Sequence, residues 1–345
     1  MDTASSDSRY AGMIAALAQR HAQPLWDRYH RITTREPHAV DAPMAWAWSD
    51  MEPLVERAAR EVAMEDAERR VLLLTHPAFA GHVATTTNLS GGLQTLLPGE
   101  TARAHRHSLQ AIRFVMSGSG AVTTVNQHRC PMHEGDLVLT PAWTWHEHIH
   151  QGSQRMVWFD GLDLPLLRHL DSMFFEIAGP DADMFVPPAT AAALGQRDAV
   201  VLGPDPDGGG RGAQANRYRF SWARAVDAIA SAPRQPDGSR WLRYGDGLTG
   251  GPVLPTLDCY LLACDRQNAT RPFRSTSNAI CVVARGHGSS HVGAHTITWQ
   301  KNDVFTLPHW NWISHTALSD DAVIFMMTDR EFLAMMGYLR EETQA

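Results

Sequence analysis

The chain has 345 residues, of which 44% are hydrophobic and 19% are charged, a composition typical of a globular protein with more than one domain. The formal net charge of -7 excludes the basic surface that a nucleic-acid partner normally requires. No run approaches the roughly 18 apolar residues of a membrane span, and the first residues lack the pattern of a signal peptide. We therefore expect a cytoplasmic protein whose four unpaired-looking cysteines are reduced thiols.

Residues 1–83 are predicted to form an N-terminal helical arm. The stretch 10–30 places Met13, Ile14 and Leu17 on one helical face, and the segment MEPLVERAAREVAMEDAERRVLLL is typical of an amphipathic helix that runs into an apolar strand. We expect this arm to pack on a later domain.

Residues 84–164 and 251–345 contain short strand-like segments separated by glycine, proline and asparagine. In the first of these regions Gly118 and Gly120 indicate a tight hairpin connection. The intervening residues 165–250 are predicted to be a linker region, with a helix at LLRHLDSMFFEIAG and an exposed loop at GPDPDGGGRGAQ. A final helix is predicted for REFLAMMGYLREE at the C-terminus.

The two strand-rich regions form a degenerate internal repeat. Gly118-Ser-Gly120 matches Gly286-His-Gly288, and GDLVLTPAWTWHEH aligns its proline and both tryptophans with those of NDVFTLPHWNWISH. Such a repeat predicts an all-β dominated chain with two jelly-roll β-barrels, to which the N-terminal helical arm and a C-terminal helix are added.

Three histidines of the first region are candidate metal ligands. His105 and His107 flank Arg106 in an extended segment, so that both imidazoles lie on one face of a strand and Arg106 on the other. Antiparallel pairing would bring His146 beside them. Three neutral imidazoles suit Fe, Zn, Cu or Ni and leave coordination positions open. The alternative is a surface HxH pair with His146 inside the barrel.

The surroundings of these histidines resemble the two-part cupin signature, with glycines before and after the HxH pair and a GDxxxTPxxxxH run that ends on the third histidine. The resemblance implies a bicupin whose first domain, 84–164, binds one metal through His105, His107 and His146. Where cupins often have a glutamate ligand, this chain has Ala111 and Ile112. The metal would keep its full charge and favour an anionic chelator such as an ortho-hydroxy carboxylate.

Most of the chain resembles the gentisate 1,2-dioxygenases and their salicylate- and hydroxynaphthoate-cleaving relatives, through LQTLLPGETARAHRHSLQAIRF, GDLVLTPAWTWHEH and WFDGLDLPLLRHLDSMFFE. The resemblance implies one Fe(II) per chain, a small aromatic hydroxy acid and O2 as substrates, and ring cleavage between the carboxyl- and hydroxyl-bearing carbons. It also implies a homo-oligomer, as a tetramer, that serves aromatic catabolism.

The same motifs imply further site residues. Arg113 matches an arginine that pairs with the substrate carboxylate, and Gln94 matches a glutamine that contacts the substrate. His148 faces the cavity that His146 faces, and it matches a histidine that can pass protons.

Three more residues are assigned by the resemblance. Arg69 matches an arginine that reaches the pocket, although the neighbouring Arg70 is an alternative. Trp158 and Asp160 belong to the WxDGLD motif, in which Asp160 is expected to hold a histidine or an arginine in place or to be purely structural.

Two departures from the family pattern bear on the substrate. His150 stands where these proteins usually have asparagine, and Ser90-Gly91-Gly92 stands where bulkier residues are common. The two glycines predict lost side-chain volume near the pocket. A differently 5-substituted salicylate such as 5-nitrosalicylate, or 1-hydroxy-2-naphthoate, is therefore an alternative to gentisate.

The repeat maps the three histidines onto Phe273, Ser275 and Ile313, and Arg113 onto Cys281, so the second cupin (251–345) is predicted to be degenerate and metal-free. Two other classes of function stay open. One is a non-catalytic cupin that binds a ligand, against which Arg113 beside His148 argues. The other is a different metal-dependent cupin enzyme, such as an isomerase or a thiol dioxygenase.

Overall fold

The computed structural model describes residues 10–26, 28–179, 182, 200–205, 217–246 and 249–344. The chain divides into two compact units, residues 1–38 and residues 39–345. The first unit contains the helices α2 (Ala11–Ala18) and α3 (Tyr29–Ile32). In the second unit, α4 (Trp48–Glu61), α5 (Met64–Ala67) and the short helix η1 (Pro77–Phe79) precede or separate the first strands of a β-rich body.

The first barrel is a sandwich of two antiparallel sheets. Its six-stranded sheet has the order β13 (Arg219–Phe220), β8 (Leu137–Thr140), β5 (Ala111–Ser117), β10 (Met156–Leu162), β3 (Ser90–Leu96) and β2 (Arg70–Leu74). Its five-stranded sheet has the order β11 (Phe175–Ile177), β4 (Thr101–His107), β9 (His146–His150), β6 (Ser119–Val125) and β7 (His128–His133). A core that includes Val115, Met132 and Trp158 fills the space between them.

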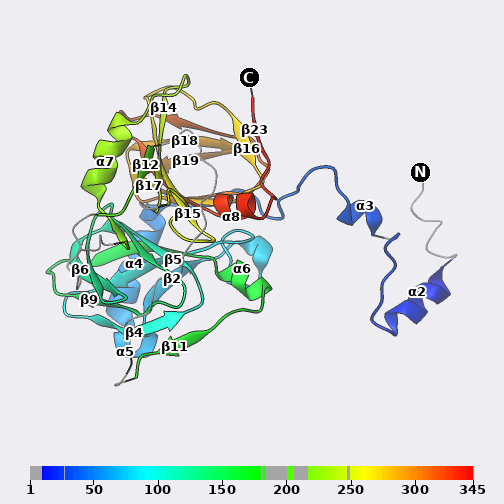
Figure 1. Ribbon diagram of the computed structural model, residues 1–345, viewed down its shortest axis with the longest axis horizontal. Helices are drawn as coiled ribbons and strands as arrows, with labels where there is room; N and C mark the ends of the chain where they lie inside the picture. The colour runs from blue at the N-terminus through cyan, green and yellow to red at the C-terminus, as the bar shows by residue number, and fades with distance from the viewer. Residues whose placement is uncertain are drawn as a thin grey trace. The chain divides into compact units, whose positions relative to one another are not determined.

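The second barrel repeats this plan. Its seven-stranded sheet has the order β1 (Ala45–Trp46), β20 (Val304–Leu307), β17 (Ala279–Arg285), β22 (Val323–Thr328), β15 (Asp258–Cys264), β14 (Ser239–Tyr244) and β12 (Val200–Leu202). Its five-stranded sheet has the order β19 (His295–Gln300), β18 (His287–Val292), β21 (Ile313–Ala317), β16 (Phe273–Ser275) and β23 (Glu341–Thr343). The two predicted barrels are thus confirmed, and they lie side by side in Figure 1 as cyan-green and yellow-orange strands.

The large sheets of the two barrels pack against each other through a shared apolar core. The rings of Phe114 on β5 and Phe325 on β22 stack at a centroid distance of 4.2 Å and an interplanar angle of 11°. Because both strands are covered on both faces, they consist almost entirely of buried apolar residues rather than of an apolar-polar alternation. The inner faces of these strands line the barrel interiors, so the shared core fixes the back wall of each barrel.

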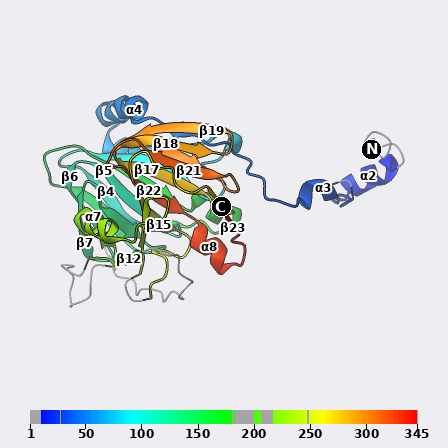
Figure 2. The ribbon, with the colours of Figure 1, turned by 90° about the horizontal axis from the view of Figure 1, so that it is seen from above.

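The helices expected at LLRHLDSMFFEIAG and REFLAMMGYLREE are both shorter than predicted. The helices α6 (Leu164–His169) and α8 (Arg330–Met335) each end two residues before a position with positive φ, which is Asp171 for α6 and Gly337 for α8. The residues that follow form β11 and β23, which pair with β4 and β16. The open hydrogen-bonding edge of each five-stranded sheet outweighs local helix propensity. Figures 1 and 2 show α8 beside β23.

The prediction of a hairpin at Gly118 and Gly120 was wrong. The strand β5 before the glycines belongs to the six-stranded sheet, and β6 after them belongs to the five-stranded sheet. Both glycines have φ near +90° (90° and 98°), which lets the chain turn from one sheet to the other. A side chain at Gly118 would also collide with the backbone oxygen of Arg155.

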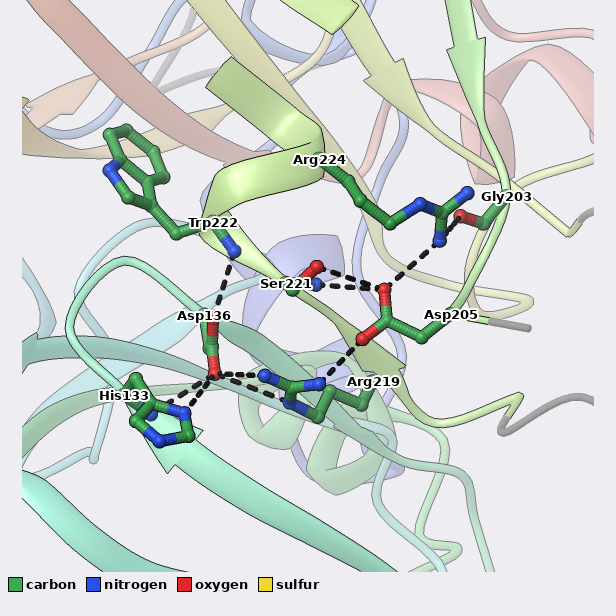
Figure 3. A network of polar contacts seen from close by, with 8 residues as sticks. All are labelled: His133, Asp136, Gly203, Asp205, Arg219, Ser221, Trp222 and Arg224. Atoms are coloured by element: carbon green, nitrogen blue, oxygen red, sulfur yellow. Dashed lines mark hydrogen bonds and ion pairs between the residues drawn. The ribbon is translucent and has the colours of Figure 1, made fainter. Parts of the chain in front are cut away.

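The region predicted as a linker contributes strands to both barrels and the helix α7 (Trp222–Ser231). Arg219 bridges the carboxylates of Asp136 (2.9 Å) and Asp205 (2.6 Å), as Figure 3 shows. The same two carboxylates accept the backbone N–H groups of Trp222 (2.8 Å) and Ser221 (3.2 Å) at the start of α7. The network ties this helix to the first barrel.

The predicted loop GPDPDGGGRGAQ lies outside the described residues from residue 206 onward. In the described part of the chain, none of the helices combines the length and the apolar character that a membrane span needs.

Substitution Phe325→Ala tests the contact between the barrels. Phe325 is fully buried and stacked on Phe114, so its truncation leaves a cavity that should lower the free energy of unfolding by about 3–5 kcal/mol. Chemical denaturation of the purified variant measures this loss. The control Tyr338→Ala removes a ring of the same size from a side chain that is 66% exposed and should change stability little. Equal losses in both variants would contradict the role of the shared core.

Candidate metal centre

Three buried histidines converge on the inner face of the five-stranded sheet of the first barrel. His105 and His107 lie on β4 and His146 on β9, and one ring nitrogen of each lies within 4.8 Å of the others. His105 and His146 are direct cross-strand partners, with ring centroids 4.0 Å apart. Arg106 points to the opposite face, where it stacks between Trp143 and Trp145. The predicted cluster and its strand alternation are confirmed.

Backbone carbonyls fix how two of the three rings are protonated. The Nδ1 atoms lie 2.9 Å from a carbonyl oxygen for His107 and 3.0 Å for His146, whereas the Nδ1 of His105 lies 3.3 Å from a carbonyl oxygen and also contacts the guanidinium of Arg69, which can only donate. A protonated Nδ1 that donates to a carbonyl leaves the Nε2 lone pair available for a metal. The Nε2 atom of His146 is buried and has no hydrogen-bond partner within the described residues. This donor set fits a divalent transition metal.

The surroundings keep the three rings unprotonated. Burial, together with the nearby guanidinium groups of Arg69 and Arg113, lowers the pKa of His105 to about 2 and that of His107 to about 4. Burial also holds the pKa of His146 well below its ordinary value. The rings are therefore neutral at physiological pH, and a metal would bind them without displacing protons.

A buried arginine faces this cluster from the six-stranded sheet. Arg113 on β5 lies 3.3 Å from the carboxylate of its cross-strand partner Asp160 on β10, and it donates to the Thr140 hydroxyl at 2.6 Å. Trp158 donates its indole N–H to the same Asp160 oxygen at 3.0 Å. Asp160 therefore contacts the arginine rather than a histidine. Thr140, which the sequence analysis did not single out, belongs to the TP step before the two tryptophans.

Two further predicted site residues lie in this cavity with unused polar atoms. Gln94 on β3 is the cross-strand partner of Trp158, and neither its amide oxygen nor its nitrogen has a partner among the described residues. His148 on β9 has its Nδ1 at 2.8 Å from the Thr123 hydroxyl, whereas its buried Nε2 has no partner there. Buried groups of this kind are rare in folded proteins unless a ligand or water satisfies them.

The choice between Arg69 and Arg70 is resolved by their contacts. Arg69 donates to the backbone oxygen of Arg103 at 3.0 Å and its guanidinium touches His105. Burial lowers the pKa of Arg69 to about 10. Arg70 points elsewhere and pairs with Glu100. Arg69 is thus the arginine that reaches the histidines.

The glycine pair and His150 differ from expectation in their placement. A side chain at Gly91 would meet Phe159 in the shared core between the barrels, whereas one at Gly92 would meet Val71 on the cavity side. A Cβ at either position would lie 2.6 Å from the nearest side-chain atom, so the space beside both glycines is filled and the expected extra volume near the site was wrong. His150 accepts from the N–H of Gly152 (3.2 Å) and contacts the oxygen of Gln154 (2.5 Å), so both ring nitrogens are engaged outside the site.

Phe175 is a site neighbour that the sequence analysis assigned to a helix. Its ring lies 5.2 Å from that of His105, because β11 pairs with the ligand strand β4. The apolar residues of FFE were the available signal in the sequence. They could not be paired with the HxH strand from the sequence alone, because the two segments lie far apart in the chain.

The second barrel has Phe273, Ser275 and Ile313 at the positions of the three histidines, and mostly apolar residues at the other positions of the site. Phe273 and Ile313 are cross-strand partners, as His105 and His146 are in the first barrel. By the same registers, Tyr260, Leu262, Cys281 and Met326 occupy the positions of Gly92, Gln94, Arg113 and Asp160, and they form the interior core. Among the described residues the three-histidine cluster is the one group of His, Cys, Asp and Glu close enough to share a metal.

Fold and site together define a bicupin with one buried three-histidine centre that faces an arginine. A family model described as "Cupin domain" matches residues 92–162. The chain is 34% identical over 320 residues to a gentisate 1,2-dioxygenase 1 of Aquipseudomonas alcaligenes, covering 92% of each chain. It is 32% identical over 340 residues to a 5-aminosalicylate 1,2-dioxygenase of Comamonas sp, covering 95% of this chain and 89% of that one.

A solved structure of salicylate 1,2-dioxygenase from Pseudoaminobacter salicylatoxidans, with gentisate, superimposes with a TM-score of 0.83 at 25% identity, over 100% of this chain and 96% of that chain. The chain belongs to the gentisate and salicylate 1,2-dioxygenase family. It is a ring-cleaving dioxygenase.

The buried His315 of the second barrel should make stability depend on pH. Its Nδ1 lies 2.7 Å from the Ser290 hydroxyl, as that of His148 lies near Thr123, and burial lowers its pKa to about 4. As pH falls from about 6.5 to about 4, His315 is protonated in the unfolded chain but not in the folded chain. This difference should lower the free energy of unfolding by up to about 3 kcal/mol.

Denaturation curves of wild type and His315→Gln across this range measure the effect. The variant should lose less stability on acidification, whereas the exposed-site control His291→Gln should follow the wild type. Parallel curves for wild type and His315→Gln would contradict the prediction.

Proposed function

We propose that the chain holds one Fe(II) at His105, His107 and His146 and cleaves a salicylate-type aromatic acid between its carboxyl- and hydroxyl-bearing carbons, with gentisate as the leading substrate. The observation that carries this proposal is the buried Arg113 opposite three neutral imidazoles, since its charge lowers the pKa of all three histidines. A cationic pocket of this kind favours an anion that chelates a metal.

Bound at the three histidines, ferrous iron would supply Lewis acidity toward a chelating carboxylate and hydroxyl, together with the redox chemistry that O2 requires. Arg113 would bind the substrate carboxylate or stabilise negative charge that develops beside it. Its orientation is held by Asp160 and Thr140. The unused Nε2 of His148 can accept or donate a proton at the reacting ring.

The remaining groups would orient the ring. The free amide of Gln94 offers one donor and one acceptor to a ring substituent, and Arg69 beside His105 adds a second positive charge. The buried Trp158 and the ring of Phe175 contribute apolar surface that excludes water. A purely ligand-binding cupin would not need these unsatisfied polar groups around an open metal site.

The relatives support a range of substituents on the ring. Because some of them are named for 5-aminosalicylate, 5-nitrosalicylic acid or 1-hydroxy-2-naphthoate, a 5-amino or 5-nitro group, or a second ring, is a rival to the 5-hydroxyl of gentisate. The relatives named for gentisate and for 5-aminosalicylate are similarly distant from this chain.

We also propose a homo-oligomer, a tetramer by family likeness, in the cytoplasm. Exposed apolar side chains along β11 and before it, such as Leu170, Phe174 and Ile177, offer surface for association. All four cysteines are buried free thiols, as expected of a reducing compartment.

Oxygen uptake tests the proposed function. The protein is loaded anaerobically with Fe(II) and then given O2 with gentisate, salicylate, 5-aminosalicylate, 5-nitrosalicylate or 1-hydroxy-2-naphthoate. Gentisate should give the highest kcat/KM, with one O2 consumed per ring opened. A rival substrate preferred by about tenfold or more would reassign the substrate. Absence of uptake with every compound would remove the proposal.

Iron content tests the metal ligands directly. Each of His105→Ala, His107→Ala and His146→Ala should lower bound iron from about one per chain to well below it, because two imidazoles bind far more weakly than three. Metal analysis after anaerobic gel filtration gives the ratio. The control His133→Ala changes a largely exposed histidine of the same barrel and should leave the ratio intact. Full iron in all three variants would refute the assignment.

Arg113 and Asp160 should have separable effects on catalysis. Arg113→Gln removes the charge that faces the substrate and should lower kcat/KM by about 10²-fold or more. Asp160→Asn keeps a hydrogen-bond acceptor for Trp158 but loses the charge that orients Arg113, so a loss of about 10-fold is expected. Both variants should bind iron normally. The exposed Arg57→Gln is the matched control, and equal kcat/KM in all three variants would contradict these roles.

A further inference from the structure

We propose that the second barrel contains a separate binding site for a planar aromatic carboxylate, distinct from the metal centre and without its own turnover. A cavity of about 350 Å³ opens at the end of this barrel that β14, β15, β16 and β23 surround. This volume lies within the range of sites that bind small organic molecules.

The cavity is the counterpart of the catalytic pocket in the internal repeat. Phe273, which lines it, has the place of the ligand His105, and Tyr260 has the place of Gly92. Strand β23, which closes one side, pairs with β16 as β11 pairs with β4. The second barrel therefore has an opening at this end, although apolar side chains fill the interior of the barrel.

Three aromatic side chains form the apolar wall of the cavity. Trp241 meets Tyr260 and Phe273 edge to face, each at a centroid distance of 6.4 Å, with interplanar angles of 82° and 83°. Rings arranged in this way present both faces and edges to a planar ligand, and this arrangement favours an aromatic ligand over an aliphatic one.

The carboxylates around the cavity already have partners. Asp237 accepts the backbone N–H of Arg271 (2.6 Å), Glu341 pairs with Arg330 (2.6 Å) and Glu342 pairs with Arg274 (2.6 Å). Asp237 is thus held by a hydrogen bond, and Glu341 and Glu342 are held by ion pairs.

Arg271 is the cationic group left for a ligand. Its Nε donates to the backbone oxygen of Gln344, and its guanidinium forms no ion pair among the described residues. A guanidinium with free terminal nitrogens beside an aromatic wall matches a benzoate-like carboxylate. Because no imidazole cluster is present here, an ortho hydroxyl is not needed for binding.

Calorimetric titration with benzoate and with gentisate under anaerobic conditions tests the site. The double variant His107→Ala/Arg113→Gln lacks both a metal ligand and the arginine that would bind a carboxylate at the metal centre, so binding that persists in it reports the second site. Adding Arg271→Gln should weaken this binding about tenfold or more, which corresponds to about 1.4 kcal/mol. Thr343→Trp, which fills the cavity from the edge strand β23, should abolish it. The exposed arginine control Arg266→Gln should leave it unchanged.

The outcomes separate this site from the catalytic one, since binding rather than turnover is measured. Similar affinities for benzoate and gentisate would assign the site to aromatic acids in general, and tighter binding of gentisate would assign it to the enzyme's own type of substrate. No binding of either acid to the double variant His107→Ala/Arg113→Gln, together with a single binding event per chain in the wild type, would overturn the proposal. So would undiminished binding in both Arg271→Gln and Thr343→Trp.

Discussion

The antiparallel pairing of β4 with β9 is the constraint on which the site depends. It sets His105 directly opposite His146, while strand alternation brings His107 to the same face. Backbone carbonyl groups then hold the Nδ1 atoms of His107 and His146, so the backbone determines both the position and the tautomer of these two ligands. A shift of this register by one residue would turn His146 away from the cluster.

The second barrel supports the site through packing. On β5, Arg113 points into the first barrel, and its neighbour Phe114 points into the shared core and stacks on Phe325. On β10, Phe159 packs in the same core, whereas Asp160 contacts Arg113. Every residue of the back wall therefore has a neighbour anchored against the other barrel, which limits the motion of the arginine and its carboxylate. The second barrel therefore contributes to the site by packing, although it has Phe273, Ser275 and Ile313 at the positions of the three histidines.

The electrostatic balance of the cavity explains its preference for anions. Arg69 and Arg113 bring two positive charges, and Asp160 is the carboxylate that compensates Arg113. Burial raises the pKa of Asp160, and the positive charge of Arg113 opposes that rise. The buried carboxylate and the buried guanidinium therefore each stabilise the charged form of the other. A divalent cation at neutral imidazoles would leave the pocket strongly positive. A substrate that carries a carboxylate and an ionisable hydroxyl supplies the missing negative charge.

The sequence by itself determined the local and repeated features of this protein. Spacing together with the resemblance to the cupin signature identified the three histidines, and the repeat identified the second barrel and its altered residues, because these patterns are short and local in the chain. Tertiary structure decided what depends on partners far apart in sequence. Only it showed that Arg69 rather than Arg70 reaches His105, that Gly91 faces the other barrel, and that both predicted helices give way to β11 and β23. In each case the outcome depends on which surface or open strand edge the fold brings alongside, and local propensity carries no information about that.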